Sequence, residues 1–190
     1  MKIILNLHAL IPSTRVNGPG IRSVVFFQGC ARRCTGCFNT ATHDFSPNKS
    51  MDVNDVLSHL PSGAEGLTIS GGEPFSQPRG LEALLKGARE RPELSTVVYT
   101  GFTMDEIEAN ESMSRILPLI DVLIAGPYDY LRPEKTGLAR GSANQTFHFL
   151  SSRYTIDDFY LPARLEVSIG SDGSVTGTGF AGLPAPVENI

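Results

Sequence analysis

The pattern of apolar and polar positions changes period repeatedly along the chain. Short apolar runs rich in β-branched and aromatic residues predict strands, and apolar residues spaced three and four apart predict helices. The predicted strands are MKIILNLHAL (1–10), GIRSVVFFQG (20–29), GLTISGG (66–72), STVVYTG (95–101) and IDVLIAGPY (120–128). The predicted helices are MDVNDVLSHLP (51–61), PRGLEALLKGARERP (78–92) and TMDEIEANESMSRILPL (103–119).

The repeated order of strand and then helix predicts an α/β fold in which helices pack on a parallel sheet. The chain has 190 residues, which is enough for one domain with a sizeable core. We therefore expect a single domain over 1–190, with a core over about 1–150 and a C-terminal extension over 151–190. Within that extension, alternation on both sides of Asp172 and Gly173 predicts a β-hairpin, and residues 181–190 are expected to fray.

Three unusual stretches follow predicted strands. They are GCARRCTGC at 29–37, SGGEP at 70–74 and TGF at 100–102. Ligands of parallel α/β sheets bind at the carboxyl ends of the strands. We therefore expect these stretches to meet at one rim of the sheet, and the segment 128–144, rich in Gly, Pro and charge, to be a long functional loop.

Composition limits which cellular compartment and which classes of partner are expected. The formal net charge is −4, which does not indicate a nucleic-acid or lipid surface as partner. The first residues are too polar and their apolar run too short for a signal peptide or a membrane span, so we expect a cytoplasmic protein. In that reducing compartment, clustered cysteines are more often metal ligands or redox groups than disulfides.

All three cysteines lie within eight residues, in the spacing Cys-x3-Cys-x2-Cys. A [4Fe–4S] cluster normally takes four thiolates, and three would leave one iron open to a small ligand. A structural zinc site needs a fourth ligand, for which His43 is the nearest candidate. Three unligated buried thiols are the least favoured alternative, because a loop rich in Gly, Arg and Thr offers no core. The open-site cluster fits the spacing best.

These motifs resemble those of the radical S-adenosylmethionine (SAM) superfamily. The resemblance begins with the cysteine spacing after an apolar strand and with GGEP at 71–74. NGPGIRSVVFFQGC at 17–30 is similar to the approach to the cluster in enzymes that activate glycyl-radical enzymes. The stretches CTGCFN, VVYTGF, DVLIAGPY and RGSANQ most resemble the branch that activates anaerobic ribonucleotide reductases. The matches span residues 17 to 145 in the same order.

Two positions distinguish this chain within the superfamily. Many members have an aromatic residue just before the third cysteine, whereas this chain has Gly36 there and Phe38 after the cysteine. That arrangement is the one expected in the ribonucleotide reductase branch. The same branch often has an acidic residue before Gly-Pro, where this chain has Ala125.

The resemblance implies two cofactors. The first is a [4Fe–4S] cluster with one open iron, held by Cys30, Cys34 and Cys37. The second is SAM, which would chelate that iron through its amine and carboxylate. The implied SAM-binding residues fall into three groups: Gly71, Gly72, Glu73 and Pro74 at the methionyl part; Thr100 and Gly101 at the adenosine; and Arg140, Ser142, Asn144 and Gln145 at the carboxylate, the ribose or the partner's radical loop.

The resemblance also implies a fold and a function. The fold is an incomplete (βα) barrel of radical SAM type with a C-terminal β-hairpin. The function is an oxidoreductase that cleaves SAM reductively and installs a glycyl radical on a large partner, an anaerobic ribonucleoside-triphosphate reductase. A flavodoxin or ferredoxin would donate the electron. Two alternatives remain: a radical SAM enzyme that modifies a peptide or small molecule, and a non-catalytic iron–sulfur or zinc module.

Overall fold

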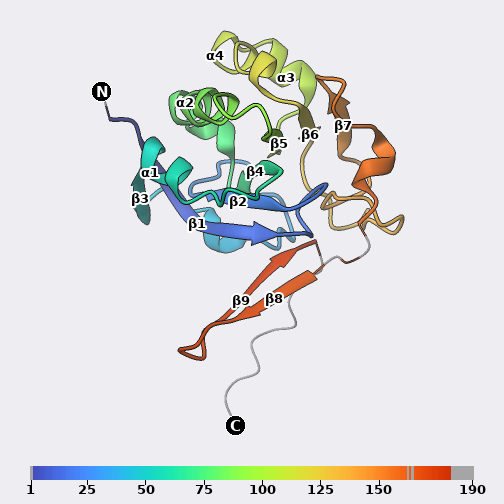
Figure 1. The fold of residues 1–190 in the computed structure, drawn as a ribbon. Helices are drawn as coiled ribbons and strands as arrows, with labels where there is room; N and C mark the ends of the chain where they lie inside the picture. The colour runs from blue at the N-terminus through green and yellow to red at the C-terminus, as the bar shows by residue number, and fades with distance from the viewer. Residues whose placement is uncertain (1, 162, 164, 181–190) are drawn as a thin grey trace.

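The computed structural model describes residues 2–161, 163 and 165–180, which form a large mixed sheet, a small sheet and several short helices (Figure 1). The predicted frayed tail, 181–190, lies outside the described residues. The strands are β1 (Ile4–Thr14), β2 (Arg22–Phe27), β3 (Lys49–Asp52), β4 (Gly66–Gly71), β5 (Ser95–Thr100), β6 (Val122–Ala125), β7 (Thr146–Phe149), β8 (Leu165–Ile169) and β9 (Val175–Gly179). The α-helices are α1 (Val53–Ser58), α2 (Pro78–Arg89), α3 (Met104–Glu108) and α4 (Glu111–Ser114), and 3-10 turns cover Thr40–Thr42, Pro74–Ser76, Leu117–Leu119 and Ile156–Phe159.

The large sheet has the strand order β3-β1-β2-β4-β5-β6-β7. Strands β2, β4, β5 and β6 are parallel neighbours, whereas β1, β3 and β7 pair antiparallel at the two flanks. The prediction of a parallel sheet is therefore confirmed for the four central strands and wrong for the flanks. The sequence pattern does not indicate β3 or β7, because both are four residues long and largely exposed.

The two faces of the sheet are covered by different parts of the chain. One face carries alternate side chains such as Val25, Phe27 and Ile69, which form the main core with the buried side of α2. On the other face, Val97 and Ile124 pack in a second cluster with side chains from 138–159. Alternation along each strand thus directs its side chains into two separate cores. Among the described helices, none is long and apolar enough to cross a membrane.

Strands β8 and β9 form their own two-stranded antiparallel sheet in the range predicted for the hairpin. Its turn contains Gly173 at φ +81°, and Asp172 accepts a hydrogen bond from the Ser174 N–H at 3.0 Å. Figure 1 shows the hairpin on the side of the large sheet opposite helices α2, α3 and α4. The hairpin therefore lies on the side of the sheet opposite these three helices.

Arg22 closes the end of the sheet where the parallel strands begin. Its side chain is completely buried, and its guanidinium donates to the hydroxyls of Thr68 and Ser95 at 2.8 and 2.9 Å. It also donates to the carbonyl oxygens of Pro19, Leu67 and Ser95 at 3.0 to 3.1 Å. These acceptors are neutral, and burial lowers the pKa of Arg22 because the charged form is disfavoured away from water.

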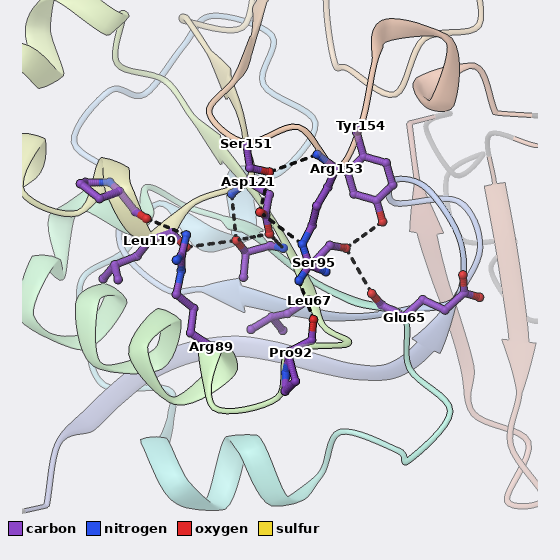
Figure 2. A network of polar contacts seen from close by, with 12 residues as sticks. Glu65, Leu67, Arg89, Pro92, Ser95, Leu119, Asp121, Ser151, Arg153 and Tyr154 are labelled. Atoms are coloured by element: carbon purple, nitrogen blue, oxygen red, sulfur yellow. Dashed lines mark hydrogen bonds and ion pairs between the residues drawn. The ribbon is translucent and has the colours of Figure 1, made fainter.

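Further polar contacts extend this closed end toward β6 (Figure 2). Tyr154 Oη lies 2.8 Å from the Ser95 hydroxyl. The Asp121 carboxylate accepts from the Thr96 N–H at 2.8 Å and from the Ser151 hydroxyl at 2.7 Å. The start of β5 is thereby joined to the residue before β6 and to the chain after β7, which fixes the spacing of the strands.

We expect Arg22→Met to lower the free energy of unfolding by about 3 kcal/mol or more, because several buried oxygen acceptors lose their donors. Urea unfolding measures this change. The matched control is Arg79→Met, since Arg79 is exposed on α2 and its replacement should change stability little. Equal stability of the two variants would contradict the role of Arg22 as the closing residue.

Candidate functional site

One pocket lies where the parallel strands end. It is lined by residues that follow four neighbouring strands: Cys30, Cys34 and Cys37 after β2; Gly71, Gly72 and Glu73 at β4; Thr100 and Gly101 at β5; and Gly126 and Tyr128 after β6. The three stretches expected to meet at one rim do so. The order of the strands in the sheet therefore assembles the pocket from segments that are distant in the sequence.

The cysteine loop is held by main-chain hydrogen bonds to the segment that follows it. The N–H of Gly29 donates to the Thr42 carbonyl at 2.8 Å, and the N–H of Cys30 to the His43 carbonyl at 3.2 Å. Within the loop, the N–H of Asn39 donates to Cys37 Sγ at 3.3 Å. Hydrogen bonds of this kind to sulfur are one means by which proteins tune iron–sulfur clusters.

The structure explains why glycine stands at position 36, where the common superfamily pattern has an aromatic residue. Its φ is +70°, and a Cβ there would lie 2.9 Å from the ring of Tyr130. The aromatic residue that follows the third cysteine, Phe38, packs edge-on against Tyr128 with ring centroids 5.2 Å apart. The long loop after β6 therefore packs directly on the cysteine loop.

The three thiols line the pocket from a single loop. Within the described residues, no three His, Cys, Asp or Glu side chains form a group that could hold a single metal ion. In a cubane cluster each thiolate binds its own iron, so thiols that line one pocket can hold three of its irons. His43 lines the same pocket, and its buried Nε2 has no hydrogen-bond partner among the described residues. This unpaired polar atom indicates a pocket built for an occupant.

The Gly-Gly-Glu-Pro turn lies directly against the start of the cysteine loop. The Gly72 N–H donates to the Phe27 carbonyl at 2.8 Å, and the Glu73 N–H donates to the Gly29 carbonyl at 2.9 Å. A Cβ on Gly72 would lie 2.4 Å from the Gly29 oxygen, so no larger residue fits without moving the backbone. Gly71 has φ +106°, which favours glycine for a second reason.

The Glu73 side chain connects this turn to the end of β5. It is 1% exposed, and its carboxylate accepts from the Phe75 N–H at 3.0 Å. It also accepts from the Thr100 hydroxyl and the Gly101 N–H, each at 2.8 Å. The two groups predicted at opposite parts of SAM are thus joined by one carboxylate. Direct contact of Glu73 with SAM stays a prediction.

Burial gives the site unusual electrostatics. It raises the pKa of Glu73 to about 7, although the three hydrogen bonds to its carboxylate oppose that shift. Burial also raises the pKa of the Cys37 thiol. Arg32 supplies a positive charge at the pocket wall and is held by a bidentate ion pair with Glu106, at 2.8 and 3.2 Å. Its guanidinium lies 4.7 Å from the centroid of the Phe102 ring.

The RGSANQ stretch reaches the pocket through Gly141 and Gln145. Of the four residues predicted there, Gln145 lines the pocket, and the other three make contacts within their own loop. Arg140 Nε donates to Glu134 at 2.5 Å, the Ser142 hydroxyl accepts from the Asp129 N–H at 3.0 Å, and Asn144 Nδ2 donates to the Pro127 carbonyl at 2.7 Å. Their predicted contact with SAM or the partner stays a prediction.

Some lining residues are absent from the predicted set. Tyr128 belongs to the GPY stretch, so the motif itself could have indicated it. Phe180 has no such signal, because it follows the C-terminal hairpin and reaches the pocket by packing on Tyr99 with ring centroids 5.6 Å apart.

Residues 16–148 match the model of the family described as 4Fe-4S single cluster domain. The chain is 34% identical over 154 residues to the anaerobic ribonucleoside-triphosphate reductase-activating protein of Pasteurella multocida, covering 76% of this chain and 97% of that protein. The proteins of the same name from Enterobacteria phage T4 and Escherichia coli K12 are 36% and 32% identical, over 74% and 77% of this chain and 92% and 99% of their own lengths. The chain belongs to this family of activating proteins.

Membership confirms the resemblance to the radical SAM activating enzymes and, with it, a [4Fe–4S] cluster and SAM as the cofactors. Among solved structures, the crystal structure of QueE from Escherichia coli is similar with a TM-score of 0.43 and 21% identity, over 53% of each chain.

We expect Gly72→Ala to destabilise this activating-family protein by about 1–3 kcal/mol, because the added methyl group collides with the backbone of the cysteine loop. Thermal unfolding measures the loss. Gly63→Ala is the matched control, because a Cβ on Gly63 meets no atom within 4 Å. The close approach of the two loops would be contradicted if both variants melted at the wild-type temperature.

Glu73 should also make stability depend on pH. Its ordinary pKa of 4.5 rises to about 7 in the folded chain, so the folded state binds the extra proton between these values. The contribution of Glu73 to the free energy of unfolding therefore falls as the pH rises from about 4.5 to about 7. Relative to Glu73→Gln, which does not titrate, the wild-type free energy of unfolding should fall by about 3 kcal/mol. Urea unfolding of both proteins from about pH 5 to about pH 8 tests this, and a constant difference would refute it.

Proposed function

We propose that this protein is a radical SAM activase that forms a glycyl radical on an anaerobic ribonucleoside-triphosphate reductase. One observation supports this most directly. In a chain of the activating-protein family, the three cysteines, the Gly-Gly-Glu-Pro turn and the end of β5 line a single pocket. That pocket provides three thiols, rather than four, beside a turn whose glycines admit close backbone approach.

When bound, the cluster would supply one electron for reductive cleavage of a carbon–sulfur bond of SAM, so that a hydrogen atom could be taken from a glycine of the reductase, with methionine and 5′-deoxyadenosine as products. Cys30, Cys34 and Cys37 would hold three irons of the cluster. Gly71, Gly72 and Pro74 would shape the turn against which the methionyl part lies.

The other residues of the site would position the ligands and would not take part in the chemical step. Glu73 fixes Thr100 and Gly101 by accepting their hydrogen bonds, and so sets the distance between the two ends of the SAM site. Arg32 adds a positive charge at the wall of the pocket that the three cysteines line, which would help to neutralise an anionic cluster. Arg140, Ser142 and Asn144 would shape the loop that faces the ligand or the partner, because their side chains fix its conformation.

The wider organisation belongs to the same proposal. The large sheet, with its parallel centre and open edges, would be an incomplete (βα) barrel of radical SAM type, and residues 1–190 one domain. A flavodoxin or ferredoxin would deliver the electron at the cysteine loop. The clustered thiols fit a reducing compartment, so we place the protein in the cytoplasm.

Replacing any one of Cys30, Cys34 and Cys37 with Ala should abolish reductive SAM cleavage, because three thiolates are the minimum that holds an open-site cluster here. The anaerobically reconstituted protein is reduced with dithionite, and release of 5′-deoxyadenosine is measured. Thr35→Ala is the control, because Thr35 is exposed within the same loop. It should cleave SAM like the wild type.

SAM cleavage that survives the replacement of one cysteine would contradict the proposal that all three cysteines hold the cluster. A reconstituted protein that holds zinc and no sulfide would contradict the proposal that this protein is a radical SAM enzyme. Glycyl-radical formation on the reductase, followed by electron paramagnetic resonance, tests the partner. SAM cleavage with a peptide or small molecule as hydrogen donor, but none with the reductase, would favour the alternative substrate class.

A further inference from the structure

The hairpin β8–β9 lies beyond residue 148, where the match to the family model ends. It is nevertheless fixed to the chain between β1 and β2. The Glu166 carboxylate accepts from the Thr14 hydroxyl at 3.1 Å and from the Arg15 N–H at 3.0 Å. On the other strand, the Thr178 hydroxyl donates to Asn17 Oδ1 at 2.8 Å, and both side chains are buried. Each strand of the hairpin is thus anchored separately.

The anchored hairpin lines a second cavity of about 280 Å³ against the face of the sheet opposite α2. Phe26 and Ser70 come from that face, and Gly177, Thr178 and Gly179 come from β9. Strand β9 therefore forms one part of the cavity wall, and the face of the sheet forms another.

This second cavity adjoins the cofactor pocket. Phe38, Asn39 and Ser70 line both, and so do Tyr99 and Phe180, whose rings pack together at the boundary. A group bound in the second cavity would lie next to a cofactor bound in the first. This is the place from which a hydrogen atom would be removed.

The walls of the second cavity suit a polypeptide backbone. Strand β9 contributes two glycines, which add no side chain, and the rest of the lining includes the hydroxyl of Ser70 and the amide of Asn39. The rings of Phe26, Phe38, Tyr99 and Phe180 complete the lining, so polar groups and flat aromatic faces alternate around the cavity. A segment that contains glycine fits such walls, because it brings accessible N–H and C=O groups and no Cβ at its centre.

We propose that the C-terminal hairpin is a partner-binding element, with β9 forming the wall against which the glycine-bearing segment of the reductase binds. This inference rests on the proposed function. It adds that residues outside the family match decide how well the partner's segment is held.

The experiment separates partner binding from cofactor chemistry. The double variant Glu166→Ala/Thr178→Val removes the polar anchors of both strands, and Gly177→Val keeps the anchors but narrows the cavity. Each is studied as the full chain with its reconstituted cluster. The control is Ile169→Ala, since Ile169 is 76% exposed at the end of β8 near the turn.

Two readouts are compared. For both test variants the KM for the reductase in glycyl-radical formation should rise about tenfold, which corresponds to a loss of about 1.4 kcal/mol in binding. SAM affinity, and SAM cleavage by the dithionite-reduced protein alone, should stay at the wild-type level. The Ile169→Ala control should match the wild type in every readout.

Three results would overturn the inference. Unchanged KM values in both variants would show that the hairpin is dispensable for the partner. Equal losses of SAM affinity and of glycyl-radical formation would show that it only supports the cofactor pocket. A wild-type protein that forms no radical on the reductase would remove the proposed function and the inference together, whereas an active wild type with unaffected variants removes the inference alone.

Discussion

The buried carboxylate of Glu73 is the contact on which the geometry of the site depends. Its side chain accepts hydrogen bonds from the end of β5, while its own N–H donates to the carbonyl of Gly29 at the start of the cysteine loop. One residue therefore joins the ends of three parallel strands. Because it lies away from water, any shift of those ends would leave buried polar groups without partners, which is costly. The site owes its precision to this linkage.

The two ends of the parallel strands are built differently. Where the strands begin, Arg22 fills the space between them and its donors are met by hydroxyl and carbonyl oxygens. Where they end, glycines and small side chains keep a pocket open. Ligands of α/β sheets bind at the carboxyl ends, and the closed end explains how this sheet keeps its spacing while the other end stays hollow.

Local patterns predicted most of the fold, because β2, β4, β5 and β6 are apolar runs and α2 has a regular buried side. Strands β3 and β7 escaped prediction because only pairing with a neighbour makes them strands. The cysteine spacing alone indicated a metal site, and the Gly-Gly-Glu-Pro turn was identified through its resemblance to the radical SAM superfamily. The roles of Glu73 and Phe180 were not, since the first depends on Thr100 and the second on Tyr99, both distant in the sequence.

The backbone contact between the 72–73 turn and Gly29 has a consequence for how such a protein can be redesigned. The contact is made by main-chain atoms and requires that residue 72 has no Cβ. Side chains at other positions of the two loops can therefore be changed, but neither loop can be lengthened. Strand β3 and helix α1, which lie in the segment that joins the two loops, take no part in the hydrogen bonds between the turn and the start of the cysteine loop. Insertions there leave the register of the two loops unaltered, whereas a single residue added to either loop would shift every ligand-facing group beyond it.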